Sequence, residues 1–122
     1  MIQNGDEIGG HKITGELGRG GMGVVYKAYD KTLERPAAIE MMLADQATET
    51  NKKRFIREAA AIARCNHPGI INVYSYGEQD GLPYFVMEYV DGKPLFSFLE
   101  LARTLKTAKN LEELRTYGYI QA

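Results

Sequence analysis

A glycine-rich segment between two strand-like runs constrains the fold of this chain more than any other feature. Residues Gly18 to Gly23 follow the pattern G-x-G-x-x-G. Polar and apolar or small residues alternate over 12–17, and the run 24–29 is rich in strand-forming residues. In a dinucleotide-binding fold such a loop leads into a helix, whereas here it leads into a second strand. We therefore expect the glycines to close a hairpin, whose backbone N–H groups can approach phosphate oxygens because few side chains intervene.

The remaining elements follow from hydrophobic periodicity and turn signals. A third strand is expected at 37–42, after Pro36, and the apolar stripe of Phe55, Ala59, Ile62 and Ala63 predicts a helix at 50–65. Strand-like runs at 70–77 and 82–90 are joined through an Asp-Gly pair, which is a hairpin signal. Helical patterns at 95–105 and 111–120 complete the chain. The expected order is three strands, a helix, two strands and further helices.

Several other motifs stand in register with the glycine loop. They are Val25 after the loop, Ala38-Ile39 on the third strand, Glu58 on the helix, the His-Pro-Gly-Ile-Ile run at 67–71 and the Met-Glu-Tyr-Val-Asp-Gly run at 87–92. In this order they resemble the N-terminal lobe of a bacterial-type (Hanks-type) serine/threonine protein kinase over roughly residues 10 to 105. The amino-acid sequence of the loop and its flanks, from Leu17 to Tyr26, most resembles that of the bacterial members.

The resemblance implies an α+β fold. We expect a protein-kinase-like N-lobe, with a twisted five-stranded antiparallel sheet, one packed helix and additional C-terminal helices. A polar tail is expected at 1–9, the lobe at 10–93 and a C-terminal helical segment at 94–122. The expected core comprises Leu17, Val25, Ala38, Ile39, Phe55, Ala59, Ile62, Ile71, Val73, Phe85, Val86 and Met87.

The resemblance also implies a vestigial nucleotide pocket. Its residues would be Leu17, Gly18, Gly20, Gly23, Val25, Ala38, Met87, Glu88 and Val90. Leu17, Val25, Ala38 and Met87 would form its roof and back wall, and the backbone of Glu88 and Val90 would hydrogen-bond the base. The alternative is that these are only core and strand residues. For Val25 and Ala38 the two interpretations are compatible, because a core residue can also line a pocket.

Glu40 departs from the family pattern. The family places a lysine there, which pairs with the phosphates and with the helix glutamate, here Glu58. Two carboxylates ~4 Å apart repel by ~4 kcal/mol at an effective dielectric constant near 20. The helix would swing outward, or one carboxyl would stay protonated. Lys27 is a conceivable replacement cation, although a solvent-facing strand lysine is the simpler interpretation.

The family's catalytic motifs do not occur in these 122 residues. Neither His11 nor His67 precedes Arg-Asp, and neither Asp80 nor Asp91 belongs to an Asp-Phe-Gly sequence. We expect no catalytic residue, no metal site, no cofactor and at most weak ATP binding. Three functions follow: a catalytically inactive binding or regulatory module, a truncated fragment of a longer serine/threonine kinase, or half of an enzyme completed by a second chain. Glu40 counts against the third.

Charge, cysteine content and hydrophobicity limit which partners and which location the chain can have. Because the net charge is only −1 and no apolar run reaches about 18 residues, we expect the chain to bind neither nucleic acid nor a membrane. The basic cluster Lys52, Lys53, Arg54 and Arg57 is interpreted as a solvated helix face, with a phosphate- or partner-binding patch as the alternative. Cys65, the single cysteine, fits a reducing, cytoplasmic location. In a complete kinase a second lobe would cover one face of this lobe. We expect a protein partner to bind that face and residues 94–122, and we favour a homodimer. The alternatives are that residues 94–122 fold back on their own lobe or form a frayed tail.

Overall fold

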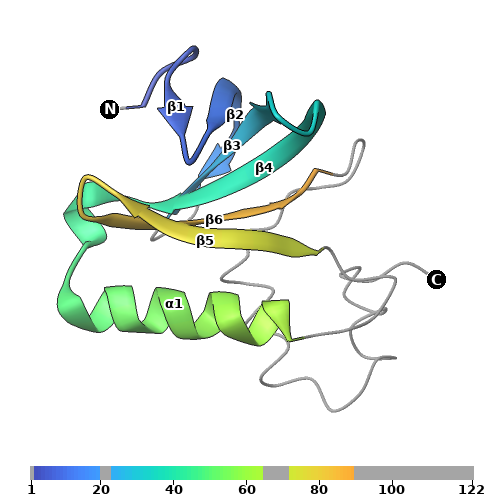
Figure 1. Ribbon diagram of the computed structural model, residues 1–122. Helices are drawn as coiled ribbons and strands as arrows, with labels where there is room; N and C mark the ends of the chain where they lie inside the picture. Colours follow the sequence, from blue (N-terminus) through green and yellow to red (C-terminus); the bar gives the residue numbers. More distant parts are fainter. Residues whose placement is uncertain (1, 20–22, 65–71, 90–122) are drawn as a thin grey trace.

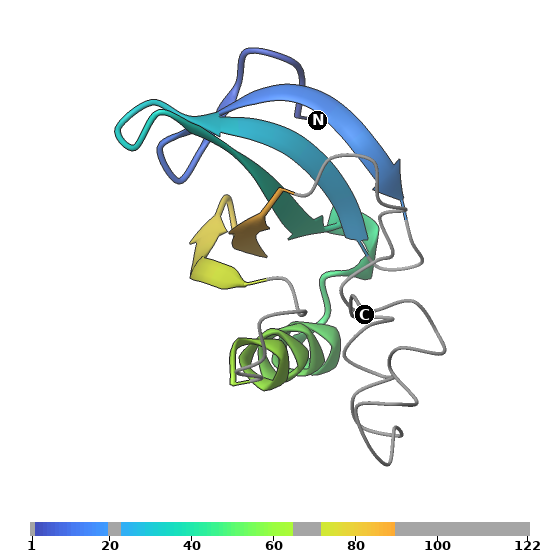
Figure 2. The ribbon, with the colours of Figure 1, turned by 90° about the vertical axis from the view of Figure 1, so that its right-hand side faces the viewer.

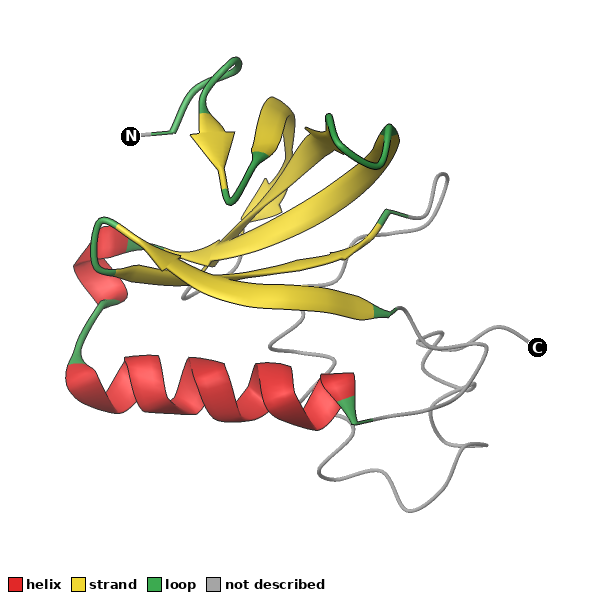
Figure 3. Cartoon of the chain, in the orientation of Figure 1, coloured by secondary structure: helices red, strands yellow, loops and turns green. Residues whose placement is uncertain are grey.

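The computed structural model describes residues 2–19, 23–64 and 72–89, which form an antiparallel sheet lying over one helix (Figure 1, Figure 3). The elements are β1 (Glu7–Ile8), β2 (His11–Arg19), β3 (Gly23–Asp30), β4 (Arg35–Met42), the 3₁₀ helix η1 (Ala44–Gln46), α1 (Glu49–Ala63), β5 (Val73–Gln79) and β6 (Leu82–Glu88). The strand order across the sheet is β1-β2-β3-β4-β6-β5. Within these ranges no helix is both long and apolar enough to cross a membrane.

The expected kinase N-lobe-like arrangement of strands around one helix is confirmed, but the expected count of five strands was wrong. The sheet has six strands, because Glu7–Ile8 pairs with His11 and Lys12 as β1. A two-residue strand is too short to show an alternating pattern, so the sequence carries no local signal for it. The helices expected at 95–105 and 111–120 lie outside the described residues.

Two hairpins turn through pairs of residues with positive φ. Asp80 and Gly81, at φ 53° and 78°, join β5 to β6, as the Asp-Gly signal predicts. Gly9 and Gly10, at 55° and 80°, join β1 to β2 in the same way. Turns of this kind match the right-handed twist of the strands they connect.

The sheet curls until its two edges meet at one end (Figure 2). Strands β1 and β5 are the opposite edges of the sheet, yet the Gln79 side chain donates a hydrogen bond of 3.1 Å to the Glu7 carbonyl oxygen. The Tyr84 hydroxyl lies against Gly9 of the β1–β2 turn and Gly77 of β5. Side chains therefore link strands that are far apart in the strand order.

Two apolar clusters fill the two faces of the curled sheet. One contains Val25, Ala38, Met42, Phe55, Ala59, Phe85 and Met87, and joins the sheet to α1. The other contains Ile8, Ile13, Val24, Tyr26, Ala28, Ala37, Ile39, Met41, Tyr84 and Val86, inside the curl. Strand β4 contributes to both clusters in alternation, because successive side chains of a strand point to opposite faces.

Most of the expected core is confirmed. Val25, Ala38, Ile39, Phe55, Ala59, Phe85, Val86 and Met87 are buried. Leu17 and Val73 are half-buried and pack against the helix-side cluster. Ile71 and the side chain of Ile62 lie outside the described part of the structure. The cluster inside the curl was largely unexpected, because it forms only when β1 and β2 fold over the sheet.

Candidate functional site

The glycine segment lies between two paired strands, as the sequence predicts. Gly18 lies near the end of β2 and Gly23 begins β3, and the register places Gly18 opposite Val25. The β2 register shifts between Glu16 and Gly18, which is a bulge. Bulges increase the local twist of a strand, so this one helps β2 to curl over the sheet. Gly20 lies outside the described residues.

The apolar residues predicted to line the pocket gather on the helix-facing side of the sheet. Val25, Ala38 and Met87 are buried in one cluster, and Leu17 packs against it. Ala38 of β4 stands directly opposite Met87 of β6. The structure thus brings together the four residues expected to form the roof and back wall.

Glu88 ends β6 at the edge of this cluster. Its backbone N–H donates to the Asn72 carbonyl oxygen over 2.9 Å, and its carboxylate accepts a 3.3 Å hydrogen bond from the Asn72 N–H. These two bonds tie the end of β6 to the start of β5. Val90, the other residue expected to contact a base, lies outside the described residues.

Glu40 is a buried carboxyl residue in the middle of the sheet. Its exposed fraction is 1%, and it stands opposite Val25 on β3 and Phe85 on β6. A Cβ atom placed on Gly23 would lie 3.5 Å from Glu40 Oε2 and 3.2 Å from the Met41 carbonyl oxygen. The carboxyl group therefore lies beside Gly23, and a side chain on that glycine would fit only tightly against the Met41 carbonyl oxygen.

Helix α1 is held against the sheet next to Glu40. The rings of Phe55 and Phe85 lie 5.2 Å apart between centroids, with their planes tilted by 49°. The backbone of Glu58 belongs to α1, but its side chain lies outside the described part of the structure. Repulsion between Glu40 and Glu58 therefore stays a prediction. Among the described residues no group of three His, Cys, Asp or Glu side chains could hold a metal ion.

Lys27 differs from the solvent-facing residue that the sequence suggested. It is half-buried on β3 beside Ala38, and its Nζ lies 4.8 Å from the centroid of the Tyr89 ring. A cation over an aromatic face is attracted by the ring quadrupole. No pattern in the sequence shows this contact, since it depends on how β3, β4 and β6 stand side by side.

The sequence matches the family model for the protein kinase domain over residues 11–119. It is 42% identical over 119 residues to a probable serine/threonine-protein kinase of Streptomyces coelicolor, covering 93% of this chain and 17% of that protein. It is 38% identical over 108 residues to serine/threonine-protein kinase PrkC of Bacillus subtilis, covering 86% of this chain and 17% of PrkC. The chain thus spans about a sixth of the length of these relatives.

Solved structures agree with the sequence relatives. The apo form of PpkA-294 aligns with a TM-score of 0.70 at 26% identity, over 89% of this chain and 43% of that one. The PknI kinase domain of Mycobacterium tuberculosis aligns with a TM-score of 0.62 at 30% identity, over 75% of this chain and 37% of that one. The chain therefore belongs to the protein kinase domain family, and it corresponds to the N-terminal portion of a domain homologous to bacterial serine/threonine kinases.

Proposed function

We propose that this chain, by itself, is a catalytically inactive kinase N-lobe that acts as a binding or regulatory module. The observation that carries the proposal is the buried Glu40, which lies beside Gly23 on the strand where the family places its phosphate-binding lysine. Near it Val25, Ala38 and Met87, which the family resemblance assigns to the nucleotide pocket, are buried in one cluster. The lobe would therefore keep its shape while presenting the opposite charge to a phosphate.

Electrostatics explains why this charge matters. A lysine at this position attracts the α- and β-phosphates, whereas a carboxylate repels them, and burial weakens the screening of either interaction. The sequence also contains neither the H-R-D-x-x-x-x-N nor the D-F-G motif, which supply the base and metal ligands in the family. A restored lysine would not replace these groups.

Radiolabel transfer from ATP tests the proposal. The chain and its Glu40→Lys variant would each be incubated with Mg-ATP and a generic protein substrate, beside an intact bacterial serine/threonine kinase as the positive control. We expect no incorporation above background from either form. Robust incorporation by either form would refute the proposal, because neither contains the motifs that supply the catalytic base and the metal ligands in the family.

A second candidate function rests on the coverage of the relatives. Because the chain matches 17% of the length of two serine/threonine kinases, it also fits a piece of a longer kinase that transfers phosphate from ATP to Ser or Thr. Reading the gene beyond the codon for Ala122 separates the two. A frame that continues into the catalytic loop and D-F-G motif favours the longer kinase, and a stop codon favours the module.

A further inference from the structure

A pocket opens at one end of the curled sheet, where β1 folds over the other strands. Residues from the N-terminal segment, the end of β2, the start of β3, the end of β4 and the β5–β6 turn line it. Its volume is about 810 Å³, which lies within the range of ligand pockets in proteins. Mouths of curled or closed sheets are also a frequent place for such sites. Below we call this cavity the curl pocket.

The floor of the curl pocket is apolar. Val24 of β3 and Met41 of β4 are paired across the two strands, and each is 3% exposed. Leu43 and Leu82 are half-buried and pack against the same cluster inside the curl. All four line the pocket. A ligand with an apolar or aromatic body can therefore bury that body here, which is favourable in proportion to the apolar area removed from water.

Tyr26 places one polar group among these side chains. The residue is 6% exposed and lines the pocket, and its strand neighbours are Glu16 on β2 and Ile39 on β4. No hydrogen bond joins its hydroxyl to any residue that the structure describes. Because buried tyrosine hydroxyls usually have a hydrogen-bond partner, an unpaired one at a pocket indicates a ligand that supplies the partner.

The Tyr26 hydroxyl is neutral at physiological pH. Burial raises its pKa above the ordinary value of 10.0, while the nearby Arg19 lowers the pKa and Glu16 and Asp6 raise it. A neutral hydroxyl can donate or accept a hydrogen bond, so it does not by itself select the charge of a ligand. That selection falls to the charged residues at the rim.

Two ion pairs neutralise part of the charged rim. Four exposed charged side chains, three acidic and one basic, stand there. The basic one is Arg19, whose guanidinium donates hydrogen bonds of 2.9, 3.1 and 3.2 Å to the Glu16 carboxylate. One of the acidic ones, Glu7, forms an ion pair with Lys31. These two rim residues therefore offer little net charge to a ligand.

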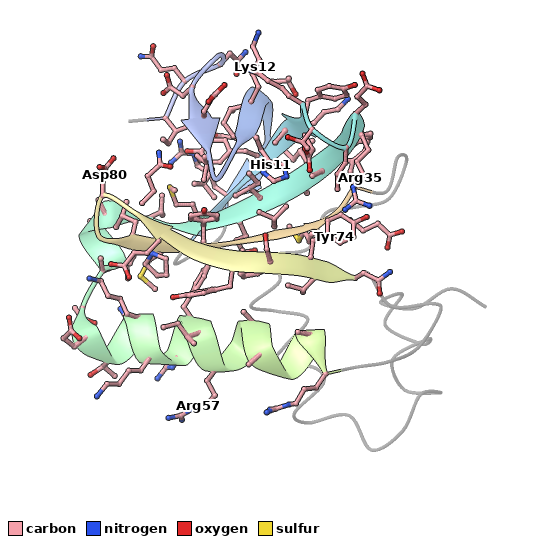
Figure 4. The ribbon with its side chains drawn as sticks, viewed as in Figure 1. His11, Lys12, Arg35, Arg57, Tyr74 and Asp80 are labelled. Atoms are coloured by element: carbon pink, nitrogen blue, oxygen red, sulfur yellow. The ribbon has the colours of Figure 1, made fainter. Side chains whose placement is uncertain are left out.

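Asp6 and Asp80 are the other two acidic residues of the rim. Within the described ranges no lysine, arginine or histidine forms an ion pair with either of them. Asp6 accepts a hydrogen bond of 2.8 Å from the Gln3 backbone N–H, which leaves its charge uncompensated. Figure 4 shows Asp80 at the tip of the β5–β6 hairpin, on the side of the sheet where β1 lies. The rim is thus net negative, which favours a cation.

We propose that the curl pocket binds a small amphipathic cation, with an ammonium group on an aromatic or branched apolar body. The body packs against the apolar floor, and the ammonium donates to the Tyr26 hydroxyl and faces Asp6 and Asp80. An anionic ligand would instead meet two like charges. Because successive side chains of a strand point to opposite faces, Tyr26 and Met41 lie on the other face of the sheet from Val25 and Glu40. The proposal is therefore independent of phosphate transfer.

NMR titration of the isotope-labelled full chain tests the proposal with four probes. Phenethylammonium has both the apolar body and the cation. Phenethyl alcohol lacks the charge, phenylacetate reverses it, and ethylammonium lacks the ring. We expect phenethylammonium to bind with a Kd of about 1 mM or tighter, which is reasonable for a ligand of this size. The other three should each bind at least about fivefold more weakly, and the largest shifts should occur in the amides of Val24, Tyr26, Met41 and Leu82.

Matched variants test where the ammonium lies. Tyr26→Phe keeps the ring but removes the unpaired hydroxyl, so it should weaken phenethylammonium binding about tenfold. Asp6→Asn combined with Asp80→Asn keeps the side-chain shapes but removes both charges. This double variant should weaken phenethylammonium binding at least about fivefold and leave phenethyl alcohol binding within about twofold. The control is Glu34→Gln at the β3–β4 turn, the opposite end of these strands from the pocket, which should change neither by more than about twofold. Melting curves verify that each variant is folded.

Three outcomes would overturn the proposal. The first is no saturable binding of phenethylammonium up to about 10 mM, a range in which a Kd near 1 mM gives almost full occupancy. The second is that phenethyl alcohol or phenylacetate binds as tightly as phenethylammonium, or that the largest shifts lie away from the curl pocket. The third is that Tyr26→Phe, or the double aspartate variant, binds phenethylammonium as Glu34→Gln does. The double variant decides the matter if Tyr26→Phe does not fold.

Discussion

Phe55 of α1 packs against Phe85 of β6, with ring centroids 5.2 Å apart and both side chains fully buried. Tilted aromatic pairs at this separation are favourable beyond the area that they bury. Phe85 is also the neighbour of Glu40 across the β4–β6 pairing. The contact that fixes the helix therefore lies next to the residue on which the proposed function rests.

Truncating this contact should strongly destabilise the lobe. We expect Phe55→Ala to lower the free energy of unfolding by about 3–5 kcal/mol, because it removes a buried ring and leaves a cavity. The control is Ile56→Ala, one position along the helix and 42% exposed, which should cost less than about 1 kcal/mol. Urea unfolding followed by circular dichroism measures both. Equal losses in the two variants would show that the helix is not held through Phe55.

Gly77 lies so close to Tyr84 that a side chain at this position should destabilise the lobe. A Cβ atom at Gly77 would lie 2.5 Å from the Tyr84 hydroxyl oxygen, so Gly77→Ala should cost about 1–3 kcal/mol of stability through overpacking. In combination with Tyr84→Leu the alanine should cost much less, giving a coupling of about 0.5–3 kcal/mol in a double-mutant cycle. Gly15→Ala is the control, since a Cβ there meets nothing within 4 Å. Strictly additive effects of the Gly77 and Tyr84 substitutions would contradict the predicted contact.

Asp30 should make the lobe less stable in acid. Backbone hydrogen bonds from Leu33 and Thr32, together with the nearby His11 and Arg35, hold the pKa of Asp30 below its ordinary value of 3.8. Because the folded-state pKa is depressed, the stabilisation is complete above the unfolded-state pKa and is lost as the pH falls through the folded-state pKa. Asp30→Asn keeps an oxygen acceptor but cannot titrate, so its unfolding free energy should fall less steeply below about pH 4. Parallel curves for the two proteins in urea titrations across this range would show that Asp30 contributes nothing to the acid sensitivity.

Nucleotide binding by the isolated chain should be very weak. A lost apolar contact of leucine size costs about 1.5–3 kcal/mol, and a lost charge-assisted phosphate hydrogen bond costs about as much again. Together with repulsion from Glu40, this predicts affinity at least about 100-fold below that of an intact kinase site, with no Mg dependence. Isothermal titration calorimetry with ATP, with and without Mg²⁺, measures it. A micromolar, Mg-dependent site would contradict both this prediction and the proposed inactivity.

Self-association through residues 94–122 remains a prediction. Two apolar sets occur there: Leu95, Phe96, Phe98, Leu99, Leu101 and Leu105, then Leu111, Leu114, Tyr117 and Ile120. Short helices need a surface to bury against, and a two-fold partner supplies one. We expect light scattering to show a dimer for the full chain and a monomer for a version ending at Lys93. A monomeric full chain, whose solubility and melting temperature do not change on truncation, would rule out this role.

The sequence by itself determined the elements that carry a local pattern. The runs at 24–29 and 82–90 predicted β3 and β6, the Phe55 and Ala59 stripe predicted α1, and the Asp80-Gly81 pair predicted the hairpin between β5 and β6. Each of these depends on interactions between residues close in the chain. The motifs in register also identified the kinase-like arrangement and the cluster of Val25, Ala38 and Met87.

Only the tertiary structure decided which surfaces face each other. It made β4 a central strand buried on both faces, which placed Glu40 at 1% exposure beside Gly23. It brought Lys27 over the Tyr89 ring. These contacts join residues distant in sequence, and they arise from strand order, bulges and curl rather than from any short-range pattern. Periodicity predicts that a residue is on one face of its own strand or helix, whereas its neighbours depend on how the whole sheet closes.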